Sequence, residues 1–288
     1  MTPAEVWSSW SFEPAVAAGL GAAAVLFVVG SRRAGGADAG RGLVFALALA
    51  AVAAGLLSPL AGLAQTTFAA HMVQHLVLIL VASPLLVASK AEVALFAGLP
   101  SAARRILGQA SKRVRVRALA DLLTKPMSVW ALHATALWIW HLPGVYRAGL
   151  ASGPLHALEH ASFLATGILF WRFAIPVSGR RALGYGAAIL LVFATALQSG
   201  ALGALLTLAG APLYPVHAAG ARAWGLTLLE DQQLAGSIMW VPSGMAYLAA
   251  MAALSWQAFR DLDARVPPRA PREAIDPEAE PLGTGERP

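Results

Sequence analysis

Long apolar runs recur along the chain and are separated by short polar segments. About 18 or more uncharged residues match the hydrocarbon thickness of a bilayer, so these runs predict membrane spans. Lipid offers the backbone no hydrogen-bond partner, and each span is therefore expected to be a helix. The pattern predicts an all-α, polytopic bundle of seven spans, at residues 14–30, 43–63, 68–89, 128–142, 155–175, 183–208 and 232–257.

The basic residues predict how this bundle is oriented. Lys and Arg are concentrated in segments 31–42, 90–127 and 172–182, whereas the alternate connections carry at most one each. Because cytoplasmic loops are enriched in Lys and Arg, we expect the N-terminus outside and the C-terminus in the cytoplasm. The residues before the first span include Glu5 and Glu13 and no basic residue, so the first span is predicted to be a permanent helix rather than a signal peptide.

Composition supports the membrane prediction and limits the chemistry. The chain is 58% hydrophobic and 12% charged, while soluble domains carry about 25% charged residues. Its net charge of +6 is explained by cytoplasmic loops that face anionic lipid headgroups, so no nucleic-acid partner is expected. The chain has no cysteine, which excludes disulfides and thiolate metal sites. Any metal must therefore bind through His, Met or carboxylate groups.

Two regions follow from these patterns. Residues 1–258 are predicted to form the transmembrane domain, with a basic cytoplasmic segment at 90–127. Residues 259–288 are rich in Pro, Arg and Glu and nearly free of apolar residues, which predicts a disordered cytoplasmic tail.

The histidines gather at one side of the predicted membrane. Two pairs have a spacing of four residues, HMVQH at His71 and His75 and HALEH at His156 and His160. This spacing places both members of a pair on one helix face. Both pairs begin their spans at the outer surface, so they lie at similar depth and converge if the third and fifth spans are neighbours.

Other polar groups could complete such a cluster. His141 ends the fourth span on the same side, and Glu159 stands beside His160. Imidazole suits copper, zinc and iron, and a carboxylate can orient an imidazole from outside the ligand set. Asp231, at the start of the seventh span, either supports the cluster in this way or caps a helix. The alternative for each histidine is a polar contact between helices.

Four segments resemble a known family. They are HMVQHLVLILVASPLL, WIWHLPGVY, HALEHASFLATGILFW and DQQLAGSIMWVPSG, and the likeness extends over about residues 40–257. The chain resembles the multi-span CtaG-type assembly proteins associated with caa-type cytochrome c oxidases of bacteria. The resemblance implies a seven-helix protein of the bacterial plasma membrane that helps to form active oxidase, through copper handling. The functional positions that it implies are His71, His75, His141, His156 and His160.

The leading hypothesis is therefore a non-enzymatic assembly factor. It would bind copper at the outer face, receive the ion from a soluble carrier and aid its delivery to a cytochrome c oxidase subunit. An intramembrane zinc hydrolase is an alternative, because histidines and acids also build catalytic zinc sites. A b-type haem protein for electron transfer is the third possibility, with His75 and His160 as axial ligands.

Overall fold

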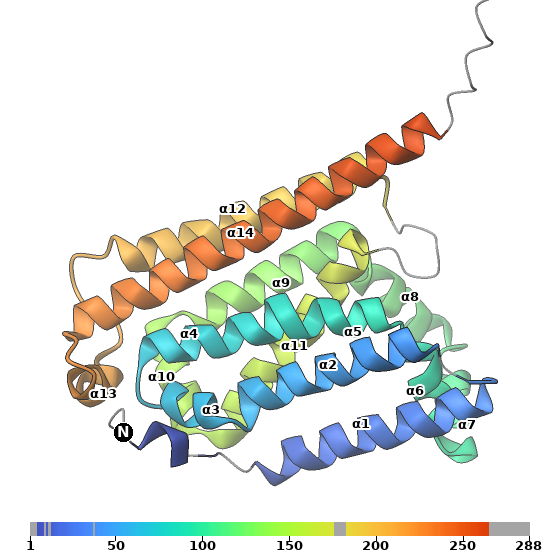
Figure 1. Cartoon of the computed structure of the whole chain (residues 1–288), viewed down its shortest axis with the longest axis horizontal. Coiled ribbons are helices and arrows are strands. Elements are labelled where there is room, and N and C mark those ends of the chain that lie inside the picture. The colour runs from blue at the N-terminus through green and yellow to red at the C-terminus, as the bar shows by residue number, and fades with distance from the viewer. Residues whose placement is uncertain (1–4, 9, 11–12, 37, 176–182, 265–288) are drawn as a thin grey trace, which may run out of the picture.

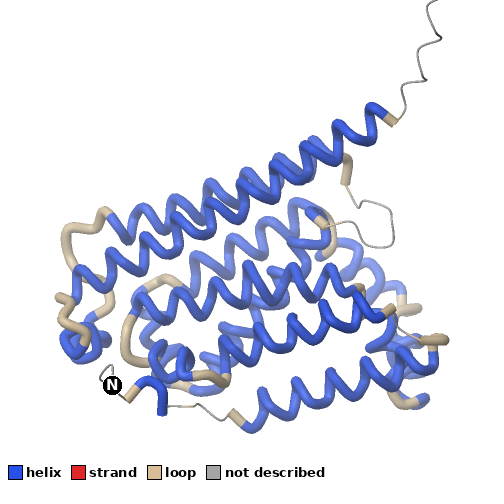
Figure 2. Tube along the Cα trace, in the orientation of Figure 1, coloured by secondary structure: helices blue, strands red, loops and turns tan. Residues whose placement is uncertain are grey.

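The structure is a computed structural model that describes residues 5–8, 10, 13–36, 38–175 and 183–264. These residues form helices joined by loops, and no strand occurs among them, as Figure 2 shows. The main helices lie side by side in one bundle (Figure 1). They are α1 (Pro14–Arg33), α2 (Ala39–Leu56), α4 (Phe68–Leu76), η2 (Val77–Ala82), α5 (Ser83–Ser89), α9 (Pro126–Trp140), α11 (Gly153–Ala174), α12 (Tyr185–Thr207) and α14 (Leu228–Asp263).

Shorter helices occupy the two ends of this bundle (Figure 1). One end holds α3 (Pro59–Ala64), α10 (Pro143–Ala151), α13 (Ala218–Ala223), η1 (Val6–Ser8) and η3 (Pro215–His217). The opposite end holds α6 (Glu92–Gly98), α7 (Ser101–Ala110) and α8 (Val114–Leu123). The predicted basic segment 90–127 thus forms three short helices and the start of α9.

Five helices of the described chain are long and apolar enough to cross a membrane. They are α1, α2, the continuous helix from α4 to α5, α12 and α14. Helices α9 and α11 correspond to the fourth and fifth predicted spans and pack against each other within the same bundle. Helix α9 has only 15 residues, and α11 carries the charged residues Glu159 and Arg172 as well as two histidines.

The bundle surface is apolar where the long helices face outward. Leu43 and Val25 are each 62% exposed, and Leu197 of α12 and Leu248 of α14 are each 64% exposed. Large exposed apolar areas of this kind are unfavourable in water. They fit helices that are surrounded by lipid.

The helix from α4 to α5 is the centre of the bundle, because it contacts α2, α11 and α14. Its middle part, η2, is a π-helical segment, which often marks a functional region, and Pro84 follows it. Two side chains satisfy carbonyl groups that this irregular segment presents. Ser83 Oγ donates to the Leu78 carbonyl at 2.8 Å, and Trp171 Nε1 donates to the Ile79 carbonyl at 2.8 Å.

A carboxylate on α14 fixes the first turn of α4. The two oxygens of Asp231 accept hydrogen bonds from the backbone N–H groups of Phe68, at 2.8 Å, and Ala69, at 3.1 Å. Thr67 Oγ1 accepts a third, from Ala70 N–H at 3.3 Å. The free N–H groups at a helix start favour negative charge, so Asp231 joins the last long helix to the central one.

Two predicted boundaries differ from the structure. The predicted span 43–63 is interrupted, because α2 ends at Leu56 and α3 begins at Pro59. Proline has no N–H to continue the helix, and Ser58 Oγ instead caps α3 by accepting from Leu60 N–H at 3.1 Å. Helix α14 continues to Asp263, beyond the predicted tail boundary at residue 258. The predicted tail from residue 265 onward lies outside the described residues.

Helix α1 lies at the edge of the bundle and packs against α6 through two glycines. A Cβ atom on Gly30 would lie 1.8 Å from the Ala94 carbonyl oxygen, and one on Gly98 would lie 2.0 Å from the Leu26 carbonyl oxygen. Arg33 adds hydrogen bonds from Nη1 to the carbonyls of Ala97, Gly98 and Leu99 at 2.9–3.3 Å. The two backbones are therefore in direct contact.

We expect Gly30→Leu to detach α1 from α6 and to destabilise the protein by at least about 1–3 kcal/mol, the usual cost of overpacking. The measurement is thermal unfolding of the purified protein in detergent. Gly19→Leu is the matched control, because it lies in the same helix and a Cβ atom there meets nothing within 4 Å. Equal unfolding temperatures for the two variants would contradict the close contact.

Candidate metal centre

His71 and His75 lie on one face of α4, about one turn inside its start. With this spacing of four residues, the two rings meet edge to face, with centroids 4.3 Å apart and an interplanar angle of 77°. Both side chains are buried, with exposed fractions of 0% and 3%. Because Asp231 and Thr67 fix the preceding turn, the depth of both imidazoles in the bundle is set by the start of the helix.

Helix α11 brings the second histidine pair alongside the first. The ring centroids of His71 and His156 are 5.5 Å apart, and those of His75 and His160 are also 5.5 Å apart. Within the second pair, the centroids are 4.2 Å apart. The structure thus gathers the four predicted histidines into one cluster, hereafter the histidine cluster.

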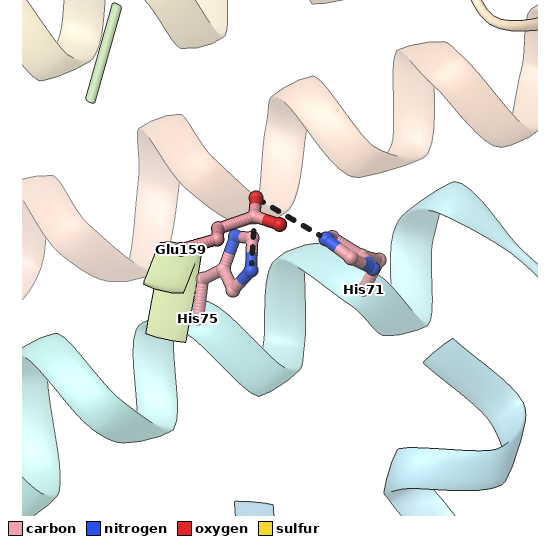
Figure 3. A group of neighbouring side chains, drawn as sticks. All are labelled: His71, His75 and Glu159. Atoms are coloured by element: carbon pink, nitrogen blue, oxygen red, sulfur yellow. Dashed lines mark ion pairs between the residues drawn. The ribbon is translucent and has the colours of Figure 1, made fainter. Parts of the chain in front are cut away.

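Glu159 extends from α11 into the space between His71 and His75, as Figure 3 shows. Its Oε1 lies 3.7 Å from His71 Nε2 and 3.5 Å from His75 Nε2, and the carboxylate is 1% exposed. One ligand atom from each of these three residues lies within 4.8 Å of the others. The separations of 3.5 and 3.7 Å between Glu159 and the two imidazoles are close to the roughly 3.4 Å expected between two ligands of one tetrahedral ion with bonds of about 2.1 Å.

The hydrogen bond of His71 Nδ1 leaves the electron pair of its Nε2 free on the side that faces Glu159. Its Nδ1 lies 3.3 Å from the Ala64 carbonyl oxygen, which can only accept, so Nδ1 carries the proton. His71 Nε2 is then an acceptor. His71 Nε2, His75 Nε2 and Glu159 Oε1 are all buried without a hydrogen-bond partner among the described residues. Unpaired buried polar atoms cost about 1–3 kcal/mol each, and a cation bound among them would remove that cost.

His141, the fifth predicted ligand, lies at the edge of the histidine cluster, just after the end of α9. Its ring centroid is 6.4 Å from that of His75. Its Nδ1 lies 2.6 Å from the Leu137 carbonyl oxygen, and its Nε2 lies 3.3 Å from Met72 Sδ. From the sequence, Met72 and Met239 are possible soft ligands, although methionines in membrane helices more often serve packing. The structure brings Met72 against an imidazole.

Asp231 does not contact the imidazoles as the sequence analysis allowed. Both of its oxygens accept hydrogen bonds from backbone N–H groups of α4. The capping alternative is therefore the observed one, although the helix that Asp231 caps is α4 rather than its own. Its influence on the histidine cluster passes through the position of α4.

The two remaining histidines have partners of their own. His133 lies deeper in the bundle, with Nδ1 3.0 Å from Thr166 Oγ1 and its ring stacked on Phe170. His217 lies in η3, and its Nε2 is 2.6 Å from the Tyr146 hydroxyl. Burial lowers the pKa of His217 to about 4 and raises the pKa of Tyr146 well above its usual value. Both groups are therefore neutral at pH 7, and the phenol donates to the imidazole.

Tyr146 is a residue that the sequence analysis did not identify. Its ring meets the edge of His71 with centroids 5.0 Å apart, and its side chain is 1% exposed. It also packs against Phe68 and Tyr214. This aromatic group closes the end of the histidine cluster that faces α10 and η3. The only signal in the sequence was its place in WIWHLPGVY beside His141.

A cavity of about 280 Å³ reaches the other side of the histidine cluster. His156 and His160 line it together with Gln65, Gln74 and Glu13, and residues of α1, α2, α3, η2 and α11 form the rest of its wall. His160 Nε2 and His156 Nε2 are also without a hydrogen-bond partner among the described residues. The α11 pair therefore joins an accessible space to the closed group of His71, His75 and Glu159.

The comparisons with known proteins agree with the resemblance of the four motifs. The profile of the cytochrome c oxidase caa3 assembly factor family matches residues 22–261. No curated protein and no solved structure matches the chain. The match includes every residue of the histidine cluster, together with Glu159, Met72 and His141. On this match, the chain belongs to the cytochrome c oxidase caa3 assembly factor family.

Proposed function

We propose that the chain crosses the bacterial plasma membrane seven times, with its N-terminus outside and the histidine cluster near the outer surface. Helices α9 and α11 would be the two additional spans, because they lie among the five apolar helices. The short helices of the basic segment 90–127 lie at the bundle end opposite to α3, α10 and α13 (Figure 1). Enrichment of Lys and Arg on the cytoplasmic side supports this orientation.

This orientation can be measured with reporters. A reporter that is active only in the cytoplasm should be active when fused to the C-terminus, and one that requires export should be active at the N-terminus. Protease treatment of right-side-out vesicles provides the control. Activity of the reporters in the reverse arrangement at either end would put the histidine cluster on the wrong side for an extracytoplasmic task.

We further propose that the protein is a non-enzymatic factor that binds copper as cargo and aids its delivery to an oxidase subunit. The observation that carries this proposal is the convergence of three buried atoms, His71 Nε2, His75 Nε2 and Glu159 Oε1, that have no hydrogen-bond partner among the described residues. Imidazole and carboxylate groups without thiolates suit a divalent ion such as Cu²⁺ or Zn²⁺. Membership of an oxidase assembly family favours copper.

The cavity beside His156 and His160 supports transfer rather than permanent retention. An ion bound to His156 or His160 would lie close to the other pair, because the rings of His156 and His160 are each 5.5 Å, centroid to centroid, from the ring of His71 or His75. Exchange with a soluble carrier and with an oxidase subunit would use the same opening. Glu13 at its wall would attract a cation toward it.

Two features favour cargo binding over the alternatives. A zinc hydrolase needs an acid or base beside its metal-bound water, yet Asp231 is occupied by α4 and Glu159 is among the proposed ligands. A haem would need space between His75 and His160. Their ring centroids are 5.5 Å apart, and the Phe163 ring lies 4.6 Å from that of His75. This close packing favours a single ion over a macrocycle.

Metal binding should depend on the histidine cluster. We expect the purified wild-type protein to bind copper, and His75→Ala to weaken binding at least about tenfold, since loss of even an indirect partner of a metal ligand costs 10–100-fold. The measurement is metal content after dialysis against a copper buffer. His133→Ala is the control, because it removes an equally buried imidazole outside the cluster. Equal losses in the two variants would indicate a general structural effect.

Oxidase assembly should fail in the same variants. Cells that lack the protein, or carry His75→Ala or His160→Ala, should synthesise oxidase subunits that contain little copper and have low activity. Added copper should restore activity partly in the variants, because mass action offsets a weakened site. The measurements are oxidase activity and copper content of membranes, with immunoblots to verify that the variants are present. Normal oxidase copper in these cells would rule out copper delivery.

A further inference from the structure

Met72 and His141 meet outside the group of His71, His75 and Glu159, and their chemistry differs from it. Met72 follows His71 on α4, is 1% exposed, and places Sδ 3.3 Å from His141 Nε2. His141 is 5% exposed. This contact joins the central helix to the end of α9 and brings a thioether sulfur within hydrogen-bonding distance of an imidazole nitrogen.

The protonation of His141 makes this contact unusual. Its Nδ1 lies 2.6 Å from the Leu137 carbonyl oxygen, which can only accept, so Nδ1 carries the proton. In the neutral ring, Nε2 is then an electron-pair donor, and a thioether sulfur has no proton to offer it. The imidazole nitrogen and the sulfur therefore each direct an electron pair at the other, with no hydrogen between them. A proton between them would place a charge on a buried imidazole, which is costly.

A soft cation satisfies both atoms. Metal bonds are about 2.0 Å to imidazole nitrogen and about 2.3 Å to sulfur, and with these lengths atoms 3.3 Å apart subtend about 100° at a shared ion. This angle is close to that of a tetrahedral ion. Thioether sulfur selects Cu(I) among the common metal ions, whereas carboxylate suits harder cations. The surroundings are apolar, because the Phe163 ring lies against both His75 and His141.

We propose that Met72 and His141 form a Cu(I)-selective subsite beside the histidine cluster. His75 stands between the two groups, with its ring centroid 4.3 Å from that of His71 and 6.4 Å from that of His141. It can serve either group as a ligand. The region then offers nitrogen and oxygen ligands around Glu159, and a sulfur ligand together with a nitrogen ligand at Met72 and His141. This inference rests on the proposed function, because it assumes that the cluster binds copper.

X-ray absorption at the copper edge tests the subsite directly. The full-length protein in detergent is loaded with one equivalent of Cu(I) under reducing, anaerobic conditions. Because the chain has no cysteine, any sulfur bonded to copper must come from methionine. We expect a copper–sulfur distance of about 2.3 Å in the wild type and in Met239→Leu, and none in Met72→Leu. Met239 is a matched control, since it is buried in the same apolar cluster as Met72.

A competition assay separates the subsite from the cluster as a whole. Met72→Leu nearly conserves side-chain volume. It should weaken Cu(I) binding against a chromophoric chelator at least about tenfold and leave Zn²⁺ binding unchanged, which also shows that the fold persists.

Copper bound by the wild type without a sulfur neighbour, or a sulfur signal that persists in Met72→Leu, would overturn the subsite and leave the proposed function standing. Failure of the wild type to bind copper at all would overturn both. The wild-type spectrum decides the question even if Met72→Leu does not fold.

Discussion

The bond between the Asp231 carboxylate and the first turn of α4 is the contact on which the rest of the arrangement depends. It joins the last long helix to the central one at the level where the central helix begins. His71, Met72 and His75 lie within two turns of that point. The hydrogen bonds of Asp231 therefore help to set their depth relative to α14. In an apolar environment, such a charged hydrogen bond to free helix N–H groups is stronger than in water.

The spacing of the histidines along the chain predicted which of them share a helix face, because that depends on helix geometry alone. A spacing of four residues is sufficient to place His71 with His75, and His156 with His160, on single helix faces. That α4, η2, α5 and α11 are neighbours is a tertiary fact. Gly167 lies at this contact, where a Cβ atom would lie 2.6 Å from Ser83 Oγ and 3.2 Å from Ser83 Cβ. The spacing predicted two pairs, and this close helix contact made them one cluster.

Some predictions that failed, or that left alternatives, concern single polar groups with distant partners. Asp231 is separated by more than 160 residues from the N–H groups it binds, so no window of sequence indicates that pairing. The contact of Met72 with His141 likewise spans 69 residues. The break after Leu56 could have been predicted from the sequence, since Ser58 followed by Pro59 is a typical helix start. The apolar run through 43–63 concealed it, because hydrophobicity reports burial or lipid contact and says nothing of where a helix bends.

The length of α14 has a consequence for the face of the protein far from the histidines. Asp231 lies beside the start of α4, so the part of α14 that is longer than the central helix extends beyond it at the opposite end. At 1.5 Å per residue, the stretch from Asp231 to Asp263 is about 16 Å longer than the central helix from Phe68 to Ser89. Figure 1 shows this overhang beyond the neighbouring helices. The chain therefore leaves its last helix at Ala264 about one helix diameter and a half above the plane where the central helix ends. The last turns of α14 thus extend past the end of the central helix and have no part of it to pack against.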